Sequence, residues 1–227
     1  YREHCIARNL DGLLLAVGME NLLAGKTAQF EELLALDMPK VSVEGFHDGV
    51  STIISDNPAG AFSALEYLYQ LGHRSIGIVT VAGENEVSMQ RLFGYQKFLQ
   101  AYGIENNPSL IFPAKSYSYE AGVAIADQVA AHPEITALFC IYDEISLGLI
   151  AGLHQRGIDV PKDLSLVSFD DIAVAKYSGL TTVRQNRERI GTLAAKKLIA
   201  LIEDETQQAE DTLVETQLVV RNSCRMY

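Results

Sequence analysis

The sequence has few cysteines, no long apolar run and fewer basic than acidic residues. Its three cysteines, Cys5, Cys140 and Cys224, lie far apart and form no CxxC pair, which excludes a disulfide framework or a zinc knuckle and favours a reducing compartment. No stretch of about 18 apolar residues is present, so we expect no membrane span. Lys and Arg number 18 against 29 Asp and Glu, a net charge of −11, so this chain is a poor candidate to hold DNA by itself.

The chain does contain enough apolar sequence for a substantial core. Hydrophobic residues make up 48% of its 227 residues, which suits one large domain or two small lobes. Apolar runs that alternate with amphipathic segments are typical of parallel sheets covered by helices on both faces. The predicted strands cover residues 12–17, 41–43, 53–55, 75–81, 110–112, 137–142, 164–169 and, as one edge strand, 213–220. The predicted helices cover residues 30–36, 58–71 (with Asn57 as cap), 92–102, 120–131, 145–156 and 189–202.

Parallel sheets of this kind bind ligands beyond the carboxyl ends of their strands, so the polar residues that follow the apolar runs form the candidate site. Arg91 stands at the predicted opening of a helix, where its guanidinium could bind vicinal hydroxyls or a carboxylate; an ordinary surface arginine is the alternative. Asp170 and Asp171 end another strand and could accept hydrogen bonds from a ligand, or else cap the next helix. Tyr117 and Tyr142 could offer flat faces to a sugar ring, or belong to the core or its rim.

No constellation in the sequence supports catalysis. Gly25-Lys26-Thr27 lies between a predicted strand and helix, as a phosphate loop would, but Glu20 stands where that motif needs glycine and would repel phosphate. The five histidines lack the spacing of a metal site or of a nucleophile with its base, and His73-Arg74 is predicted to form a solvated turn. We therefore expect no enzyme activity, no metal and no catalytic cofactor.

Taken together, these segments resemble the effector-binding domain of the lactose/galactose repressor family. The resemblance covers essentially the whole chain. The crossing LTT-x-x-Q after a strand that ends in two aspartates, with R-N-S near the end, points to repressors more than to their transport-protein relatives. The matching segments are DG before an apolar strand (11–17), ISDNPAG (54–60), YLYQLGHRSIGIVT (67–80), RLFGYQKFL (91–99), TALFC to SFDD (136–171), LTTVRQNRERIGTLAAKKLI (180–199) and LVVRNS (218–223).

The resemblance implies a two-lobed fold of the periplasmic-binding-protein type, with the ligand in the cleft between the lobes. One lobe would comprise residues 1–54 and 187–213, and the other residues 55–184 and 214–227, each a parallel sheet with helices on both faces. By position in the family's motifs, the implied ligand-binding residues are Arg91, Asp170, Tyr117, Tyr142 with Asp143 beside it, Gln185 and Glu44.

The implied function is that of an effector sensor in a cytoplasmic bacterial transcriptional repressor. A small metabolite, a sugar or sugar derivative, would bias the angle between the lobes, and a homodimer would transmit that angle to DNA-reading heads. Because the resemblance begins inside the N-terminal lobe, we expect the helix-turn-helix head, the hinge and the first strands of that lobe to lie outside this sequence, so that operator DNA is bound only through the absent head. The alternative is a periplasmic protein that delivers sugar to a transporter, against which the unpaired cysteines and LTT-x-x-Q argue.

Overall fold

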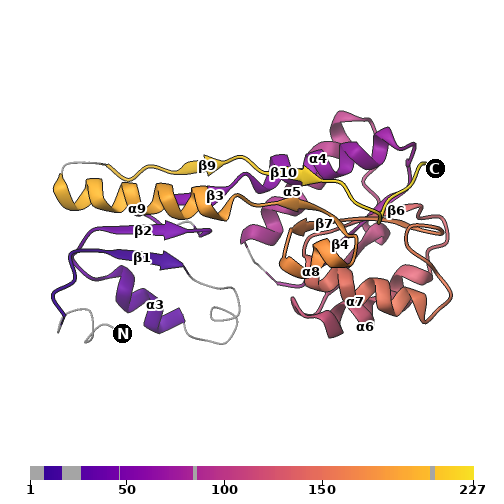
Figure 1. Cartoon of the computed structure of the whole chain (residues 1–227), viewed down its shortest axis with the longest axis horizontal. Helices are drawn as coiled ribbons and strands as arrows, with labels where there is room; N and C mark the ends of the chain where they lie inside the picture. Colours follow the sequence, from indigo (N-terminus) through magenta and orange to yellow (C-terminus); the bar gives the residue numbers. More distant parts are fainter. Residues whose placement is uncertain (1–7, 17–26, 46, 84–85, 205–207) are drawn as a thin grey trace. The chain divides into compact units, whose positions relative to one another are not determined.

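The chain divides into two compact units (Figure 1). The computed structural model describes residues 8–16, 27–45, 47–83, 86–204 and 208–227, with the backbone alone for residues 27–29. Unit 1 combines Tyr1–Ser55 with Asn186–Val214, and unit 2 combines Asp56–Gln185 with Glu215–Tyr227. Each unit is built on a sheet of mainly parallel strands with helices packed against it, which confirms the predicted α/β class.

Unit 1 contains a four-stranded parallel sheet in the order β1-β2-β3-β9. The long helix α9 packs against β1, β2 and β3. The buried core of this unit joins Val41 and Ile53 of the sheet to Ile190 and Ala194 of α9 and to Val214. The elements are β1 (Leu13–Ala16), α3 (Thr27–Leu34), β2 (Lys40–Val43), β3 (Ser51–Ser55), α9 (Arg187–Glu203) and β9 (Thr212–Val214).

Unit 2 contains a six-stranded sheet in the order β10-β8-β7-β6-β4-β5, parallel throughout except that β10 pairs antiparallel with β8. Helices α4 and α5 pack together on one face of this sheet, and α6 and α7 pack together on the other (Figure 1). The strands are β4 (Ile76–Val81), β5 (Ile111–Ala114), β6 (Ala137–Cys140), β7 (Ser165–Asp170), β8 (Thr181–Arg184) and β10 (Gln217–Val219). The helices are α4 (Asn57–Gln70), α5 (Glu86–Ala101), the 3-10 turn η1 (Pro108–Leu110), α6 (Tyr119–Ala130), α7 (Asp143–His154) and α8 (Ala173–Tyr177).

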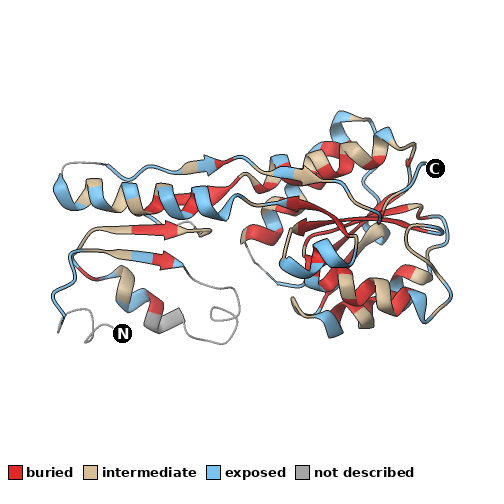
Figure 2. Ribbon diagram, viewed as in Figure 1, coloured by how far each residue is buried: buried red, intermediate tan, exposed pale blue. Residues whose placement is uncertain are grey.

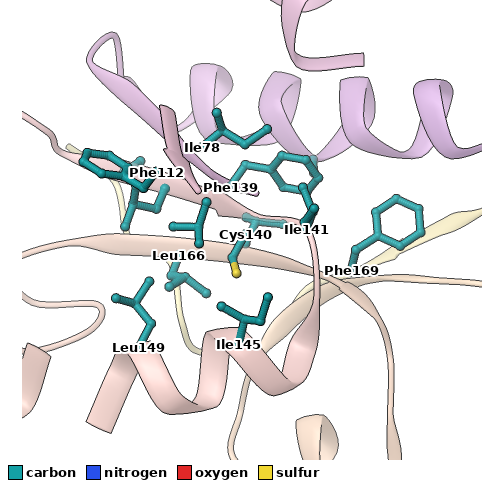
Figure 3. Close-up of a cluster of buried hydrophobic side chains, with 14 of the residues drawn as sticks. Ile78, Phe112, Phe139, Cys140, Ile141, Ile145, Leu149, Leu166 and Phe169 are labelled. Carbon is teal, nitrogen blue, oxygen red and sulfur yellow. The ribbon is translucent and has the colours of Figure 1, made fainter. Parts of the chain in front are cut away.

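The central strands of unit 2 are buried along their length. Every residue of β4 and β6 is buried, and β7 is buried up to its last residue (Figure 2). A strand covered by helices on both faces must be apolar on both, which is why these strands are near-continuous apolar runs in the sequence. Ile145 and Leu166 lie on the side of β6 to which the Cys140 sulfur points, and Phe139 lies on the other side (Figure 3); burial raises the pKa of the Cys140 thiol to about 12. Cys140 is therefore a small residue of the core.

Several segments differ from their predicted structure, among them the last predicted strand and the turn at His73. The single edge strand predicted over residues 213–220 is two short strands, β9 in unit 1 and β10 in unit 2, because the chain passes between the units after Val214. The prediction of a solvated turn at His73 is wrong, because His73 is only 1% exposed. Its ring nitrogens lie 2.9 Å from Thr136 Oγ1 and 3.0 Å from Ser165 Oγ, and Nε2 lies 3.1 Å from the carbonyl of Arg225. The C-terminal segment, distant in sequence, covers this turn.

Candidate functional site

The sheet of unit 2 has a topological switch point between β4 and β6. Along the chain, β5 is added on one side of β4, whereas β6, β7 and β8 are added on the other side. The helices that follow β4 and β6, α5 and α7, therefore lie on opposite faces of the sheet. Open α/β sheets bind their ligands at the carboxyl ends of the strands beside such a point.

Arg91 lies at this switch point and is 1% exposed. Helix α5 begins at Glu86, so Arg91 lies in its second turn and not at the helix opening that the sequence predicted. Its Nε donates a hydrogen bond to Asn57 Oδ1 (2.9 Å), and Nη1 donates to the carbonyl of Ile141 (2.5 Å), the residue after β6. Its Nη2 forms an ion pair with Asp170 Oδ1 at 3.0 Å. Burial and these contacts exclude the alternative of an ordinary surface arginine.

Aromatic rings surround the Arg91 guanidinium. Its central carbon lies 3.7 Å from the ring centroid of Phe169 and 4.7 Å from that of Tyr142. The Tyr117 ring packs edge-on against Tyr142, with centroids 4.7 Å apart, and its hydroxyl lies 3.4 Å from Ser88 Oγ. The Tyr142 hydroxyl is buried without a hydrogen-bond partner that meets normal geometry among the described residues, and burial raises the pKa of Tyr142 to about 12.

Asp170 is the charged member of the cluster that reaches the surface. Its side chain is 14% exposed, and its Oδ1 accepts a hydrogen bond from Gln185 Nε2 (2.8 Å) as well as pairing with Arg91. Gln185 follows β8, which neighbours β7 in the sheet. The structure thus brings together Arg91, Asp170, Gln185, Tyr117 and Tyr142 at one edge of unit 2.

Asn57 belongs to this cluster, and sequence reasoning missed it. It is fully buried, accepts from Arg91 and donates from Nδ2 to Gln90 Oε1 (3.0 Å). Its predicted role as helix cap is wrong, because Asp56 caps α4 by accepting from the amide of Ala59 (3.0 Å). Both residues are good caps, so local sequence could not separate them.

Asp143 is fully buried in the first turn of α7. Its Oδ1 accepts from Thr182 Oγ1 (2.6 Å) and its Oδ2 accepts from the amide of Ile172 (2.9 Å). Burial, which disfavours the charged form, raises the pKa of Asp143 to about 6 despite these hydrogen bonds.

Asp171 lies in the opposite electrostatic environment. Burial raises its pKa, but hydrogen bonds from Arg221 and Arg184, each 2.6 Å long, outweigh burial and hold the pKa of Asp171 below its ordinary value. The alternative that Asp170 or Asp171 caps the next helix is wrong, since α8 begins after Ile172 without a side-chain cap.

Glu44 belongs to unit 1, at the carboxyl end of β2, with a φ of 60°. Its Oε1 accepts from the amide (3.1 Å) and the hydroxyl (2.8 Å) of Ser55 at the end of β3. Its Oε2 is buried and has no hydrogen-bond partner within the part of the chain that the structure describes. Its observed hydrogen bonds therefore remain inside unit 1.

The described residues contain no group of three or more His, Cys, Asp and Glu side chains that could hold a metal ion. Within the same ranges, no helix has the length and apolar character needed to cross a bilayer. Gly25 and Lys26 of the phosphate-loop alternative lie outside the described residues.

Comparison with known proteins identifies the family. A model of the periplasmic binding protein-like domain matches residues 65–224. The ribose operon repressor of Haemophilus influenzae is 30% identical over 221 residues, which cover 95% of this chain and 64% of the repressor. The HTH-type transcriptional repressor CytR of Escherichia coli K12 is 33% identical over 177 residues, which cover 77% of this chain and 52% of CytR. The chain thus spans between one half and two thirds of the length of these relatives.

The fold is likewise similar to that of solved regulators. The complex of the transcriptional regulator CelR with cellobiose superposes with a TM-score of 0.83 at 28% identity, covering 98% of this chain and 68% of CelR. These relatives are regulators, which favours a repressor over the transport-protein alternative. The chain therefore belongs to the periplasmic binding protein-like family and is an effector-binding domain of the lactose/galactose repressor type.

Proposed function

We propose that this chain is the effector sensor of a cytoplasmic bacterial repressor, and that it binds a sugar or sugar derivative at the carboxyl edge of the unit 2 sheet. The relatives support the class of ligand: one is a ribose operon repressor, and the solved regulator CelR is a complex with cellobiose. The relatives are regulators and not enzymes, and we propose that this chain likewise makes and breaks no covalent bond.

The observation that carries the proposal is the buried ion pair between Arg91 and Asp170. A sugar hydroxyl both donates and accepts hydrogen bonds, so a carboxylate fixed beside a guanidinium offers it both kinds of partner. Asp170 is partly exposed, whereas Arg91 lies behind it and orients it. Gln185 adds an amide, and the Tyr117 and Tyr142 rings add apolar faces against which the C–H face of a sugar ring can pack.

The ligand would act by shifting populations. The chain passes between the units after Ser55, Gln185 and Val214, so Gln185 is both a candidate ligand contact and the last residue of unit 2 before a crossing. A sugar that binds one arrangement of the units more tightly would favour that arrangement, by as much as its difference in affinity for the two. We propose that a homodimer carries this change to DNA-reading heads outside this chain, which bind the operator.

A thermal-shift screen with matched variants tests the proposal. The panel contains D-ribose, cellobiose, nucleosides, purine bases and sugar phosphates. A ligand present at a hundredfold excess over its Kd stabilises the native state by about 2.7 kcal/mol. Asp170→Asn should weaken the shift, because it removes the negative charge that pairs with Arg91 and replaces one acceptor oxygen by a donor, whereas Glu105→Gln, an exposed change in the same unit, should preserve it. A panel without any shift, or an equal shift in both variants, would contradict the proposal.

A further inference from the structure

We propose that Asp143 is a positioning residue of this site: its buried carboxylate holds the turn after β7 in the conformation that directs Asp170 toward Arg91 and Gln185. The proposal rests on the proposed function only where it concerns effector binding. Its structural part concerns the turn itself, which can be tested without a ligand.

The turn is strained. Asp170 has a φ of 116° and Asp171 a φ of 52°, two consecutive non-glycine residues in the left-handed region. Each such residue costs on the order of 1–3 kcal/mol and persists only where its surroundings impose the conformation. The polypeptide from Asp170 to Ile172 therefore needs restraints from other elements.

Asp143 supplies such restraints within the strained pair and directly after it. Its Oδ2 accepts from the amide of Ile172, the residue directly after the pair, at 2.9 Å. Its Oδ1 accepts from Thr182 Oγ1 at 2.6 Å, and that same hydroxyl oxygen accepts from the amide of Asp171 at 3.4 Å. One carboxylate thus connects α7, the turn and β8.

A second restraint on the turn comes from the Asp171 carboxylate. It pairs with Arg184, whose side chain is 49% exposed so that water and salt screen the pair, and with Arg221, whose side chain is 14% exposed. The hydrogen bonds of Asp143 are charge-assisted and fully buried, where such bonds are stronger. Because Asp143 is fully buried with both oxygens occupied, its effect on a ligand passes through Asp170.

Amide hydrogen exchange of unliganded protein tests the structural part. Asp143→Ala should lower the protection of the Ile172 amide at least tenfold while the amides of β4 keep theirs. Asp143→Asn should preserve that protection, because its Oδ1 can accept from Ile172 and its Nδ2 can donate to Thr182. Unchanged protection of Ile172 in Asp143→Ala, or an equal loss across all of unit 2, would overturn the proposal.

Calorimetric titration with D-ribose and with cellobiose tests the link to Asp170. Asp143→Ala should weaken binding about tenfold or more, Asp143→Asn should restore it, and Asp143→Ala should add nothing in an Asp170→Asn background. Additive losses in the double variant would overturn the link, because Asp143 would then act independently of Asp170. If neither sugar binds the unaltered protein, that result counts against the proposed function, whereas the exchange experiment still decides the positioning role.

Discussion

Both units consist of a sheet covered by helices, but their strands are buried to different extents. In unit 2, β4 and β6 are buried at every residue. In unit 1, β3 is likewise buried at every residue, but the outer strands β1 and β9 expose Leu14 (46%) and Leu213 (60%). A strand buried on both faces accommodates polar groups mainly at its ends, so a larger core also defines more sharply where a site can form. The polar cluster of unit 2 is built at such ends, around Arg91, whereas the candidate residue of unit 1 is the single carboxylate of Glu44.

A glycine-to-alanine substitution in one helix of each unit should give the largest difference in stability between the two units. A Cβ on Gly148 of α7 would lie 1.8 Å from the carbonyl oxygen of Tyr119, whereas a Cβ on Gly191 of α9 meets nothing within 4 Å. We expect Gly148→Ala to lower the free energy of unfolding by more than about 3 kcal/mol through overpacking. Gly191→Ala should raise it by up to about 1 kcal/mol through helix propensity. Urea denaturation followed by circular dichroism measures both, and effects of the same sign would show that the two helices are packed alike.

Asp143 and Asp171, two carboxylates of unit 2, should affect the pH dependence of stability in opposite directions. The pKa of Asp143 rises from 3.8 to about 6 on folding, so its stabilising contribution is present below pH 3.8 and is lost as the pH rises through about 6. From pH 4 to pH 7, the free energy of unfolding of Asp143→Asn should therefore rise by about 2 kcal/mol relative to that of the unaltered protein. The titratable groups that face Asp143 are the Asp170 carboxylate and the Cys140 thiol, and both are unchanged in this variant.

Asp171→Asn is the matched control for that measurement. The pKa of Asp171 is lowered on folding, so its contribution is present above its unfolded pKa and is lost as the pH falls. This variant should lose stability relative to the unaltered protein as the pH rises toward about 5, opposite in sign to Asp143→Asn, and should change little from pH 5 to pH 7. Parallel profiles for the two variants in thermal denaturation between pH 4 and pH 7 would contradict the assignment.

Two asparagines at helix starts, one in each unit, should contribute differently to stability. Asn57 is fully buried against Arg91 and Gln90, and Asn57→Ala should cost about 2–3 kcal/mol because it leaves buried polar groups unpaired. Asn186 is the exposed cap of α9, accepting from the amide of Arg189, and Asn186→Ala should cost about 1 kcal/mol. Equal losses in urea denaturation would mean that Asn57 acts only as part of the helix start.

The smallest expected effect on stability belongs to unit 1. Glu44→Gln keeps one oxygen for Ser55 and replaces the unpartnered Oε2, so the free energy of unfolding should change by less than about 1 kcal/mol. If Glu44 contacts the effector, binding of D-ribose or cellobiose in calorimetry should nevertheless weaken about tenfold. A loss of stability without any change in affinity would assign Glu44 to the structure of unit 1 alone.

Much of the fold could be predicted because its central strands leave a strong local signal. The apolar runs predicted at 75–81 and 137–142 contain β4 and β6, and the run predicted at 164–169 overlaps β7. The start of α5 was missed because Glu86–Gln90 was assigned to the polar loop before Arg91, although Val87 and Ser88 are buried in the structure. His73 was missed for a related reason, since its partners come from β7 and from the C-terminal segment, far along the chain.

The sequence by itself determined where the buried strands end, and so it could nominate Asp170 at the end of one strand and Arg91 in the segment that follows another. Only the tertiary structure decided which strand ends are neighbours, because strand order depends on pairings between segments that local periodicity does not encode. That order creates the switch point between β4 and β6, buries Arg91 against Asn57 and Ile141, and connects Asp143 to the turn after β7. A side chain's partners, and with them its charge state and role, are set by these distant contacts.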